Sequence, residues 1–193
     1  LGEVNEAITT AGKVQYVVAG GNFAKHGYKF TGVMRVLETI LRYEYLWTKI
    51  RIQGGAYGAT ARFDSNGLGI FASYRDPKLA ESFQAYYDLP AWFEKEEFSA
   101  RELDKYVIGT ISGMDTPLTN TMRLDTVTTS WLKNITDEHR QKSRNEVLDV
   151  TNEDLQALAP VIRDMLSDGY VCVVGGKQPI EANAERFNKI INA

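Results

Sequence analysis

The sequence predicts an α+β domain with helices packed on a mainly antiparallel sheet. The expected elements follow the order strand, helix, hairpin, several helices, strand and helix, and this order is typical of helices gathered on an antiparallel sheet. Two local signals support it. Apolar residues between Val33 and Leu41 recur at the spacing of one helical face. Asn66-Gly67, between two apolar-rich segments, is a strong hairpin signal.

Length and composition predict one globular domain over residues 1–193. The chain is 44% hydrophobic and 24% charged, without an internal repeat or a linker rich in Pro, Gly or Ser. Its formal charge of -3 argues against nucleic acid or an anionic membrane as a partner, because both bind clustered Lys and Arg. No apolar run reaches the length of a membrane span. Because the sequence starts with Leu1 rather than Met, we expect a piece of a longer chain.

The first half of the chain is predicted to contain one strand, one helix and a hairpin. The expected bounds are Val14–Ala19 for the strand, Val33 to about Lys49 for the helix, and Ala56–Phe63 with Leu68–Tyr74 for the hairpin. Side chains alternate along a strand. Tyr57 is therefore expected on the same face of the sheet as Ala59, Ala61 and Phe63.

The second half is predicted to be mostly helical. Asp76-Pro77 is expected to open a helix that Pro90 kinks or ends, because Asp is a favoured N-cap and Pro has no N–H to donate. Further helices are expected at Leu118–Leu132 and after the capping residues Ser99, Thr136 and Thr151. The apolar run Tyr170–Val174 predicts a central strand buried on both faces, with Cys172 in the core. A helix over roughly Pro179–Ile191 is expected to close the chain.

The stretch Arg51-Ile52-Gln53-Gly54-Gly55-Ala56-Tyr57-Gly58 is the main candidate for function. Its three glycines allow a sharp turn and a close approach to a ligand, because none carries a Cβ. Arg51 supplies a cation with several donors, and Tyr57 supplies a phenolic donor. Both groups suit carbonyl oxygens or a developing oxyanion. The alternative, on these residues alone, is a tight helix-to-strand turn with a surface Arg and a half-buried Tyr.

The sequence contains no complete metal-binding or catalytic set. Zinc needs three or four suitable ligands, and the two histidines, His26 and His139, belong to no ligand motif. The glycine run lacks the Lys-Ser/Thr ending of a phosphate-binding loop. No Gly-x-Ser-x-Gly elbow is present. We therefore expect no metal in this chain, and no activity from the chain alone.

Two spaced motifs carry a family resemblance. One is Arg51-x-Gln53-Gly54-Gly55-Ala56-Tyr57-Gly58 with the hairpin that follows, and the other is Ser73-Tyr74-Arg75-Asp76-Pro77. Together they resemble the C-terminal half of presequence-protease-type peptidases, a branch of the pitrilysin/insulinase superfamily of zinc metallopeptidases. The similarity continues through Ile108–Ile111 and Ile135–Gln141, and it spans roughly Val14 to Val174.

The resemblance implies a role for this chain. Members of the family fold two similar halves around a closed chamber, with zinc and an inverted His-x-x-Glu-His motif in the N-terminal half. The C-terminal half lacks metal and sends an Arg and a Tyr, which match Arg51 and Tyr57, to the bound peptide. Arg51 would hold a substrate carbonyl, Tyr57 would donate to the oxyanion, and Gly54 and Gly55 would lie against the substrate. The expected partners are the N-terminal catalytic half and a peptide, and the expected reaction is the degradation of unfolded peptides.

Two other functions stay open on the sequence. One is a non-catalytic structural or partner subunit of the same fold, against which the presence of Arg51 and Tyr57 argues. The other is a stand-alone peptide-binding module that accepts a peptide strand at a sheet edge near Val14–Ala19. The compartment is left open between a bacterial cytoplasm and an organellar matrix.

Overall fold

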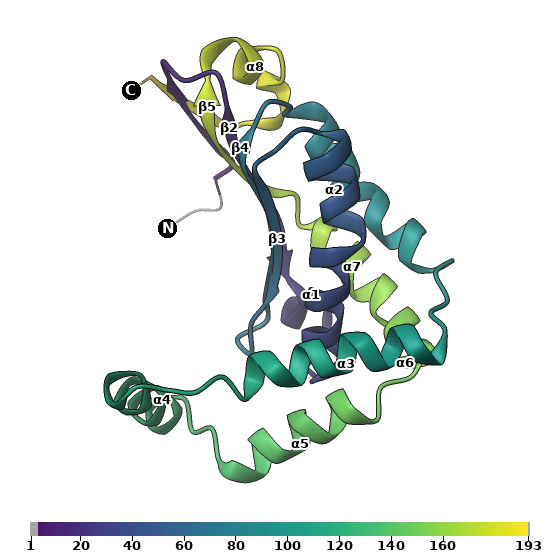
Figure 1. The fold of residues 1–193 in the computed structure, drawn as a ribbon. Coiled ribbons are helices and arrows are strands. Elements are labelled where there is room, and N and C mark those ends of the chain that lie inside the picture. Colours follow the sequence, from purple (N-terminus) through teal and green to yellow (C-terminus); the bar gives the residue numbers. More distant parts are fainter. Residues whose placement is uncertain (1–3, 193) are drawn as a thin grey trace.

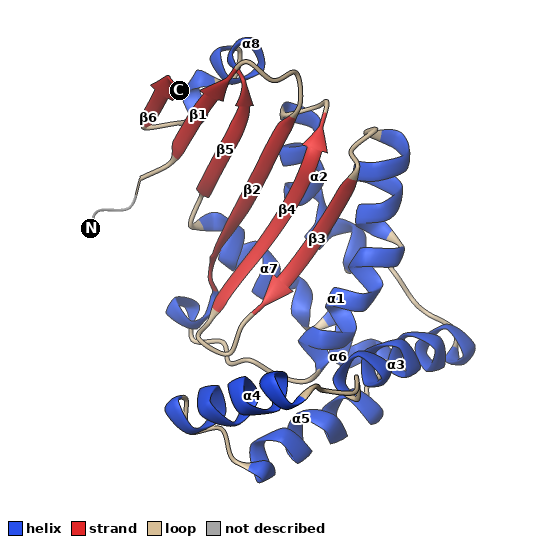
Figure 2. Cartoon of the chain, turned by 60° about the vertical axis from the view of Figure 1, so that its left-hand side comes forward, coloured by secondary structure: helices blue, strands red, loops and turns tan. Residues whose placement is uncertain are grey.

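The computed structural model describes residues 4–192 and contains a six-stranded sheet with the strand order β3-β4-β2-β5-β1-β6 (Figure 2). The strands are β1 (Glu6–Thr10), β2 (Gln15–Asn22), β3 (Gly58–Phe63), β4 (Leu68–Asp76), β5 (Tyr170–Gly176) and β6 (Lys189–Asn192). The pairs β3-β4, β4-β2 and β2-β5 are antiparallel, whereas β1 is parallel to both β5 and β6. The prediction of an α+β fold with a mainly antiparallel sheet is confirmed.

Helices cover one face of the sheet and leave the other face open (Figure 1). The covering helices are α1 (Val33–Tyr43), α2 (Ala80–Phe93) and α7 (Leu158–Ser167). The remaining helices are α3 (Ala100–Met114), α4 (Asn120–Leu132), α5 (Asp137–Leu148), α6 (Asn152–Gln156) and α8 (Lys177–Glu181), with short helical segments at Phe23–His26, Trp47–Gln53 and Ala184–Arg186. Helix α4 reaches past one end of the sheet toward the open side (Figures 1 and 2). No helix in residues 4–192 is both long and apolar enough to cross a membrane.

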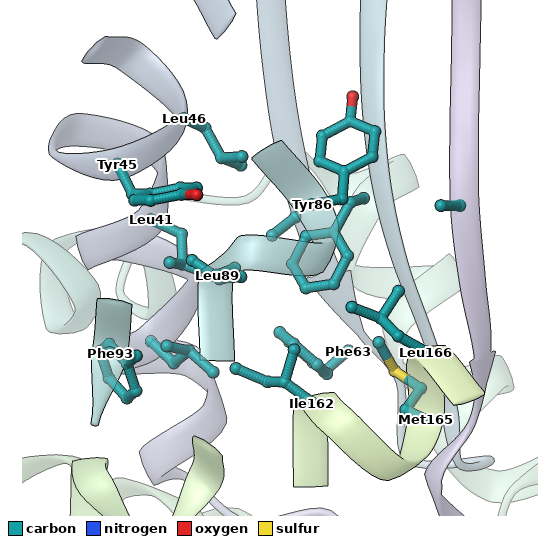
Figure 3. Packing of buried hydrophobic residues seen from close by; sticks show 14 of the residues in the cluster. Leu41, Tyr45, Leu46, Phe63, Tyr86, Leu89, Phe93, Ile162, Met165 and Leu166 are labelled. Atoms are coloured by element: carbon teal, nitrogen blue, oxygen red, sulfur yellow. The ribbon is translucent and has the colours of Figure 1, made fainter. Parts of the chain in front are cut away.

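The hydrophobic core lies between the covered face of the sheet and these helices (Figure 3). Phe71 of β4 stacks on Tyr86 of α2, with ring centroids 5.8 Å apart. Large side chains from α1, α2 and α7 fill the same layer, among them Leu41, Leu89, Phe93, Ile162 and Met165. Burying each such side chain stabilises the fold by about 1.5–3 kcal/mol. This packing fixes the sheet from one side only.

Local capping and turn signals predicted the element boundaries well. Ser99, Thr136 and Thr151 each accept a hydrogen bond from the backbone N–H three residues on, and the helices that follow begin as predicted. Helix α4 and the hairpin around Asn66-Gly67 are also present. These features depend on contacts within a few residues, so a single sequence is enough to predict them.

Three expected helix boundaries are not found in the structure. Helix α1 ends at Tyr43, and a π-helix over Trp47–Gln53 replaces the expected continuation. Asp76 does not open α2, because it remains in β4 with its side chain buried, and α2 begins at Ala80. Of the two effects expected of Pro90, a kink or an end, the end is not found, since α2 continues to Phe93. Leu89, Pro90 and Phe93 are all buried, and this packing outweighs the one lost backbone hydrogen bond.

The predictions for the C-terminal strands were partly wrong. Strand β5 is buried on one face only and Cys172 is exposed, because no described helix covers the open face. The helix expected to run to Ile191 stops at Glu181, and β6 follows it. Strands β1 and β6 were not predicted. They form a parallel pair between the two ends of the chain, and local patterns carry no signal for such a pairing.

The proposed strand addition at Val14–Ala19 is also contradicted. Strand β2 includes these residues from Gln15 onward and continues to Asn22. It is hydrogen-bonded to β4 on one side and to β5 on the other, so it has no free edge for a peptide.

The exposure of Cys172 provides a test of the open face. We expect one equivalent of a thiol reagent to label the folded chain without denaturant. Burial raises the pKa of the Cys172 thiol, and the nearby Glu6 carboxylate raises it further. The thiolate is the reactive form, so labelling should be slower than for free cysteine at neutral pH and should accelerate as the pH rises. Labelling only after unfolding would show that this face is covered.

Candidate functional site

A glycine cap at the end of the π-helix fixes the position of Arg51. The Gly55 N–H donates to the Arg51 carbonyl at 2.9 Å, and the Ala56 N–H donates to the Ile50 carbonyl at 3.1 Å. Gly55 has a φ of 85°, which favours glycine. A Cβ on Gly54 would lie 2.4 Å from the Ile50 carbonyl oxygen. Both glycines are therefore needed to bring the chain from Arg51 to Tyr57 in so short a turn.

The structure brings Arg51 and Tyr57 together on the exposed surface. The Arg51 guanidinium carbon lies 4.1 Å from the centroid of the Trp47 ring and 5.9 Å from that of Tyr57. Trp47 and Arg51 are four residues apart and lie on the same face of the helical segment. Tyr57 is 59% exposed, and within residues 4–192 its hydroxyl has no hydrogen-bond partner. The phenolic proton is thus free to donate to a ligand.

Tyr57 lies on the open side of the sheet, and its predicted position beside Ala61 and Phe63 is wrong. Strand β3 begins only at Gly58, so strict alternation does not extend back to Tyr57. Ala61 and Phe63 are buried on the covered face. The Tyr57 ring instead packs edge-on against Tyr74, with centroids 5.1 Å apart.

Tyr74 and Tyr16 extend this aromatic surface along the open face. Their ring centroids are 6.0 Å apart. Gly58 is paired with Tyr74, and a Cβ on Gly58 would lie 3.2 Å from the Tyr74 ring. The missing side chain at position 58 therefore leaves room for Tyr74 rather than for a ligand.

A β-bulge turns two consecutive side chains of β4 to the open face. Gln15 pairs with Asp76 and Val17 with Ser73, so the single residue between them in β2 faces both Tyr74 and Arg75. Tyr74 and Arg75 are both exposed, whereas Ser73 and Asp76 on either side are both buried. Arg75 has a φ of 50°, a strained conformation for a residue with a Cβ. Its guanidinium carbon lies 6.0 Å from the centroid of the Tyr57 ring.

A buried carboxylate holds the bulge in place. The side chain of Asp76 is fully buried and accepts hydrogen bonds from the Ser73 hydroxyl at 2.5 Å and the Ser82 hydroxyl at 2.6 Å. It also accepts from the Lys78 N–H at 2.9 Å. A carboxylate with three donors is satisfied without a cation. Because Ser73 and Asp76 must both point inward, the two residues between them are turned to the open face.

Trp47, Tyr16, Tyr74 and Arg75 are site residues that the sequence did not predict. Tyr16 and Tyr74 alternate with buried neighbours, and this pattern could have placed them on an exposed face. Trp47 lies one helical turn before Arg51. Nothing local in the sequence marks the extra residue in β4, so the orientation of Arg75 had no sequence signal.

The described residues do not fit a zinc site. No group of three or more His, Cys, Asp and Glu residues in the described part of the chain is arranged to hold a metal ion. His26 bonds Asp168 at 2.9 Å, and His139 caps α5. The Asp168 pKa is lowered: burial raises it, but the Asn22 N–H and the His26 side chain outweigh burial. Both histidines therefore have structural partners.

Comparison with known proteins identifies the family. Residues 5–177 match the family model described as the PreP C-terminal domain. The match covers most of the chain, so the chain belongs to the C-terminal domain family of presequence proteases, and it shares its fold with pitrilysin. The resemblance drawn from the two motifs is thereby confirmed.

The similar sequences belong to much longer proteins. The chain is 40% identical over 190 residues to Protein HypA of Clostridium perfringens, covering 98% of this chain and 20% of that protein. It is 32% identical over 186 residues to Presequence protease 1, chloroplastic/mitochondrial, of Arabidopsis thaliana, covering 95% of this chain and 17% of that protein. The chain thus spans about a fifth of the length of these relatives.

Solved structures share the fold at low sequence identity. A protease from Helicobacter pylori superposes with a TM-score of 0.66 at 17% identity, over 88% of this chain and 43% of that chain. A peptidase M16 inactive domain from Pseudomonas fluorescens gives 0.60 at 14% identity, over 90% and 44%. Pitrilysin gives 0.60 at 13% identity, over 89% and 19%. At these identities the likeness shows the fold alone.

The buried carboxylate generates a prediction about stability. Asp76→Ala leaves two buried hydroxyls and one N–H without their acceptor, so we expect a loss of roughly 3 kcal/mol or more in the free energy of unfolding. Asp76→Asn keeps one acceptor oxygen and should cost less. Asp88→Ala, an exposed site on the same helix α2, is the control and should change stability by less than about 0.5 kcal/mol. Urea unfolding measures all three, and equal effects at positions 76 and 88 would contradict the role of Asp76.

Proposed function

We propose that this chain is the metal-free, substrate-binding and oxyanion-stabilising C-terminal domain of a zinc metalloendopeptidase that degrades unfolded peptides. The observation that carries the proposal is the pairing of an exposed cation with a free phenolic donor, Arg51 and Tyr57, on one open surface. Membership of the presequence protease C-terminal family supports it. Zinc would be bound by a part of the longer protein outside these residues.

In this proposal each of the two side chains has one task. The Arg51 guanidinium, held by stacking on Trp47, donates hydrogen bonds to a backbone carbonyl of the bound peptide. The Tyr57 hydroxyl donates to the oxygen that becomes negatively charged when the scissile carbonyl is attacked. A donor already in place at that oxygen stabilises the transition state more than the ground state. Gly54 and Gly55 allow the peptide to pass close to the backbone.

Two uncovered surfaces support a place within a longer protein. The open face of the sheet is one of them. The other is α4, which has no buried residue and exposes an apolar stripe at Leu124, Val127, Trp131 and Leu132, with Trp131 80% exposed. Exposed apolar stripes of this kind mark contact surfaces. Helix α4 extends past the sheet on the side of the open face (Figure 1). The N-terminal catalytic half is the partner that we propose for both surfaces.

Tyr57→Phe in the complete protein is the central test of the proposal. Removing one exposed hydroxyl keeps the packing of the ring on Tyr74, so thermal stability should not change. A donor aimed at an oxyanion is worth about 10²–10³-fold in kcat, and we expect a loss in that range with a short fluorogenic peptide. Tyr43→Phe removes a hydroxyl from an equally exposed tyrosine of α1, outside the candidate site, and serves as the matched control. A loss of less than about threefold, as in the control, would leave Tyr57 without a catalytic role.

Arg51→Ala should act mainly on substrate binding. The contact with a backbone carbonyl exists both before and in the transition state, so we expect KM to rise more than kcat falls. Arg62→Ala, another exposed arginine on β3, is the control and should leave both constants unchanged. Steady-state kinetics of the complete protein measure the difference. An unchanged kcat/KM for Arg51→Ala would exclude the proposed contact.

A further inference from the structure

The bulge in β4 presents a second cation beside the pair Arg51 and Tyr57. Arg75 occupies a strained backbone conformation, and the buried Asp76 cluster maintains it. Strain that is maintained by surrounding structure is concentrated at functional sites. The strained and exposed Arg75 is therefore a candidate for contact with a ligand.

Within residues 4–192 the Arg75 guanidinium has no anionic partner. It forms no ion pair and donates no side-chain hydrogen bond. The adjacent carboxylate, that of Asp76, points into the core and is already bonded to two hydroxyls and one N–H. On the open face its guanidinium carbon lies 6.0 Å from the centroid of the Tyr57 ring. An arginine with five free donors beside an aromatic ring is suited to a planar anion.

We propose that Arg75 binds a carboxylate of the peptide substrate, so that the site favours peptides that carry an acidic side chain or their own C-terminal carboxylate at this position. The planar guanidinium matches a carboxylate in a two-point hydrogen-bonded pair. This inference rests on the proposed function, because it takes a peptide as the ligand. It adds a second subsite, distinct from the backbone contact of Arg51.

The distances limit where the acidic group lies along the peptide. The guanidinium carbons of Arg51 and Arg75 are 5.9 and 6.0 Å from the same ring centroid, so they are at most about 12 Å apart. An extended chain advances about 3.3 Å per residue. The carboxylate that Arg75 binds therefore belongs to a residue within about four positions of the one held by Arg51.

The test uses the complete protein and a set of matched peptides. The reference peptide has no acidic residue and has an amidated C-terminus. One series places Glu or the isosteric Gln at each position of the peptide in turn, and a second series restores the free C-terminal carboxylate at varied distances from the cleavage site. The series separate the two sources of the carboxylate. Both kcat/KM and the Kd of uncleaved peptides are measured.

The variants are chosen to preserve the bulge. Asn and Asp tolerate the left-handed conformation at position 75 better than other residues with a Cβ. We expect roughly tenfold preference for the carboxylate peptide at one position in the wild type, as for one charge-assisted hydrogen bond. Arg75→Asn should reduce the Glu-to-Gln ratio of kcat/KM to about one without changing kcat/KM for the Gln peptide. Arg75→Asp should favour a peptide with Lys at that position instead. Arg62→Asn is the control and should keep the wild-type ratio.

Several outcomes would overturn the inference. The first is a wild-type ratio of kcat/KM between Glu and Gln peptides that is near one at every position. The second is a wild-type ratio that is unchanged in Arg75→Asn. The third is an equal loss of kcat/KM for Glu and Gln peptides together with a lowered Tm, as expected of a structural role. If Tyr57→Phe loses turnover while the ratio is unchanged in Arg75→Asn, the proposed function holds and this inference fails. If Tyr57→Phe and Arg51→Ala leave turnover intact, the proposed function fails. In that case the Kd values of uncleaved Glu and Gln peptides, compared between the wild type and Arg75→Asn, test the carboxylate contact of Arg75 independently of turnover.

Discussion

The open-face site depends on one buried carboxylate. Asp76 is fully buried, yet every donor around it comes from neutral groups, the hydroxyls of Ser73 and Ser82 and the Lys78 N–H. A buried charge without such donors would be costly enough to unfold the strand end. Since Ser73 and Asp76 are three residues apart and both point inward, one extra residue must be accommodated between them. The bulge is the consequence, and it sets the direction of Tyr74 and Arg75.

The second constraint is the one-sided packing of the sheet. The three helices that cover it bury Phe71, Ala61 and their neighbours, while the opposite face carries tyrosines, an exposed cysteine and exposed arginines. A face of this composition can remain in water, because aromatic rings with hydroxyls and long cationic side chains are only partly apolar. The proposed peptide contact would use this face, so it would require no rearrangement of the core. In this proposal stability and ligand contact depend on opposite faces of one sheet.

The sequence predicted what depends on near neighbours and failed where distant segments meet. Capping at Ser99, Thr136 and Thr151 and the Asn66-Gly67 hairpin were predicted correctly, since each involves residues a few positions apart. The pairing of β1 with β6 joins the two ends of the chain and left no local pattern.

The exposure of Cys172 was missed for a related reason. Continuous apolar runs are typical of strands covered on both faces, but β5 has a described covering on one face only. For the candidate site, local motifs pointed to Arg51 and Tyr57. The bulge that orients Arg75 arises from hydrogen bonds to Ser82, in the next helix, and from the register with β2, so it needed the structure.

The positions of Arg51 and Arg75 beside Tyr57 are fixed by different parts of the structure, and this difference affects how the proposed site would work. Arg51 depends on the glycine cap of the π-helix, whereas Arg75 depends on the buried Asp76 cluster. The bulge is connected to Tyr57 by a backbone hydrogen bond, in which the Tyr57 N–H donates to the Arg75 carbonyl at 3.4 Å. A shift of the bulge would therefore move the start of β3 and with it the Tyr57 ring, while Arg51 would stay on Trp47. The binding proposed for Arg51 and the oxyanion stabilisation proposed for Tyr57 therefore depend on different parts of the structure, because only Tyr57 is connected to the buried carboxylate through the bulge.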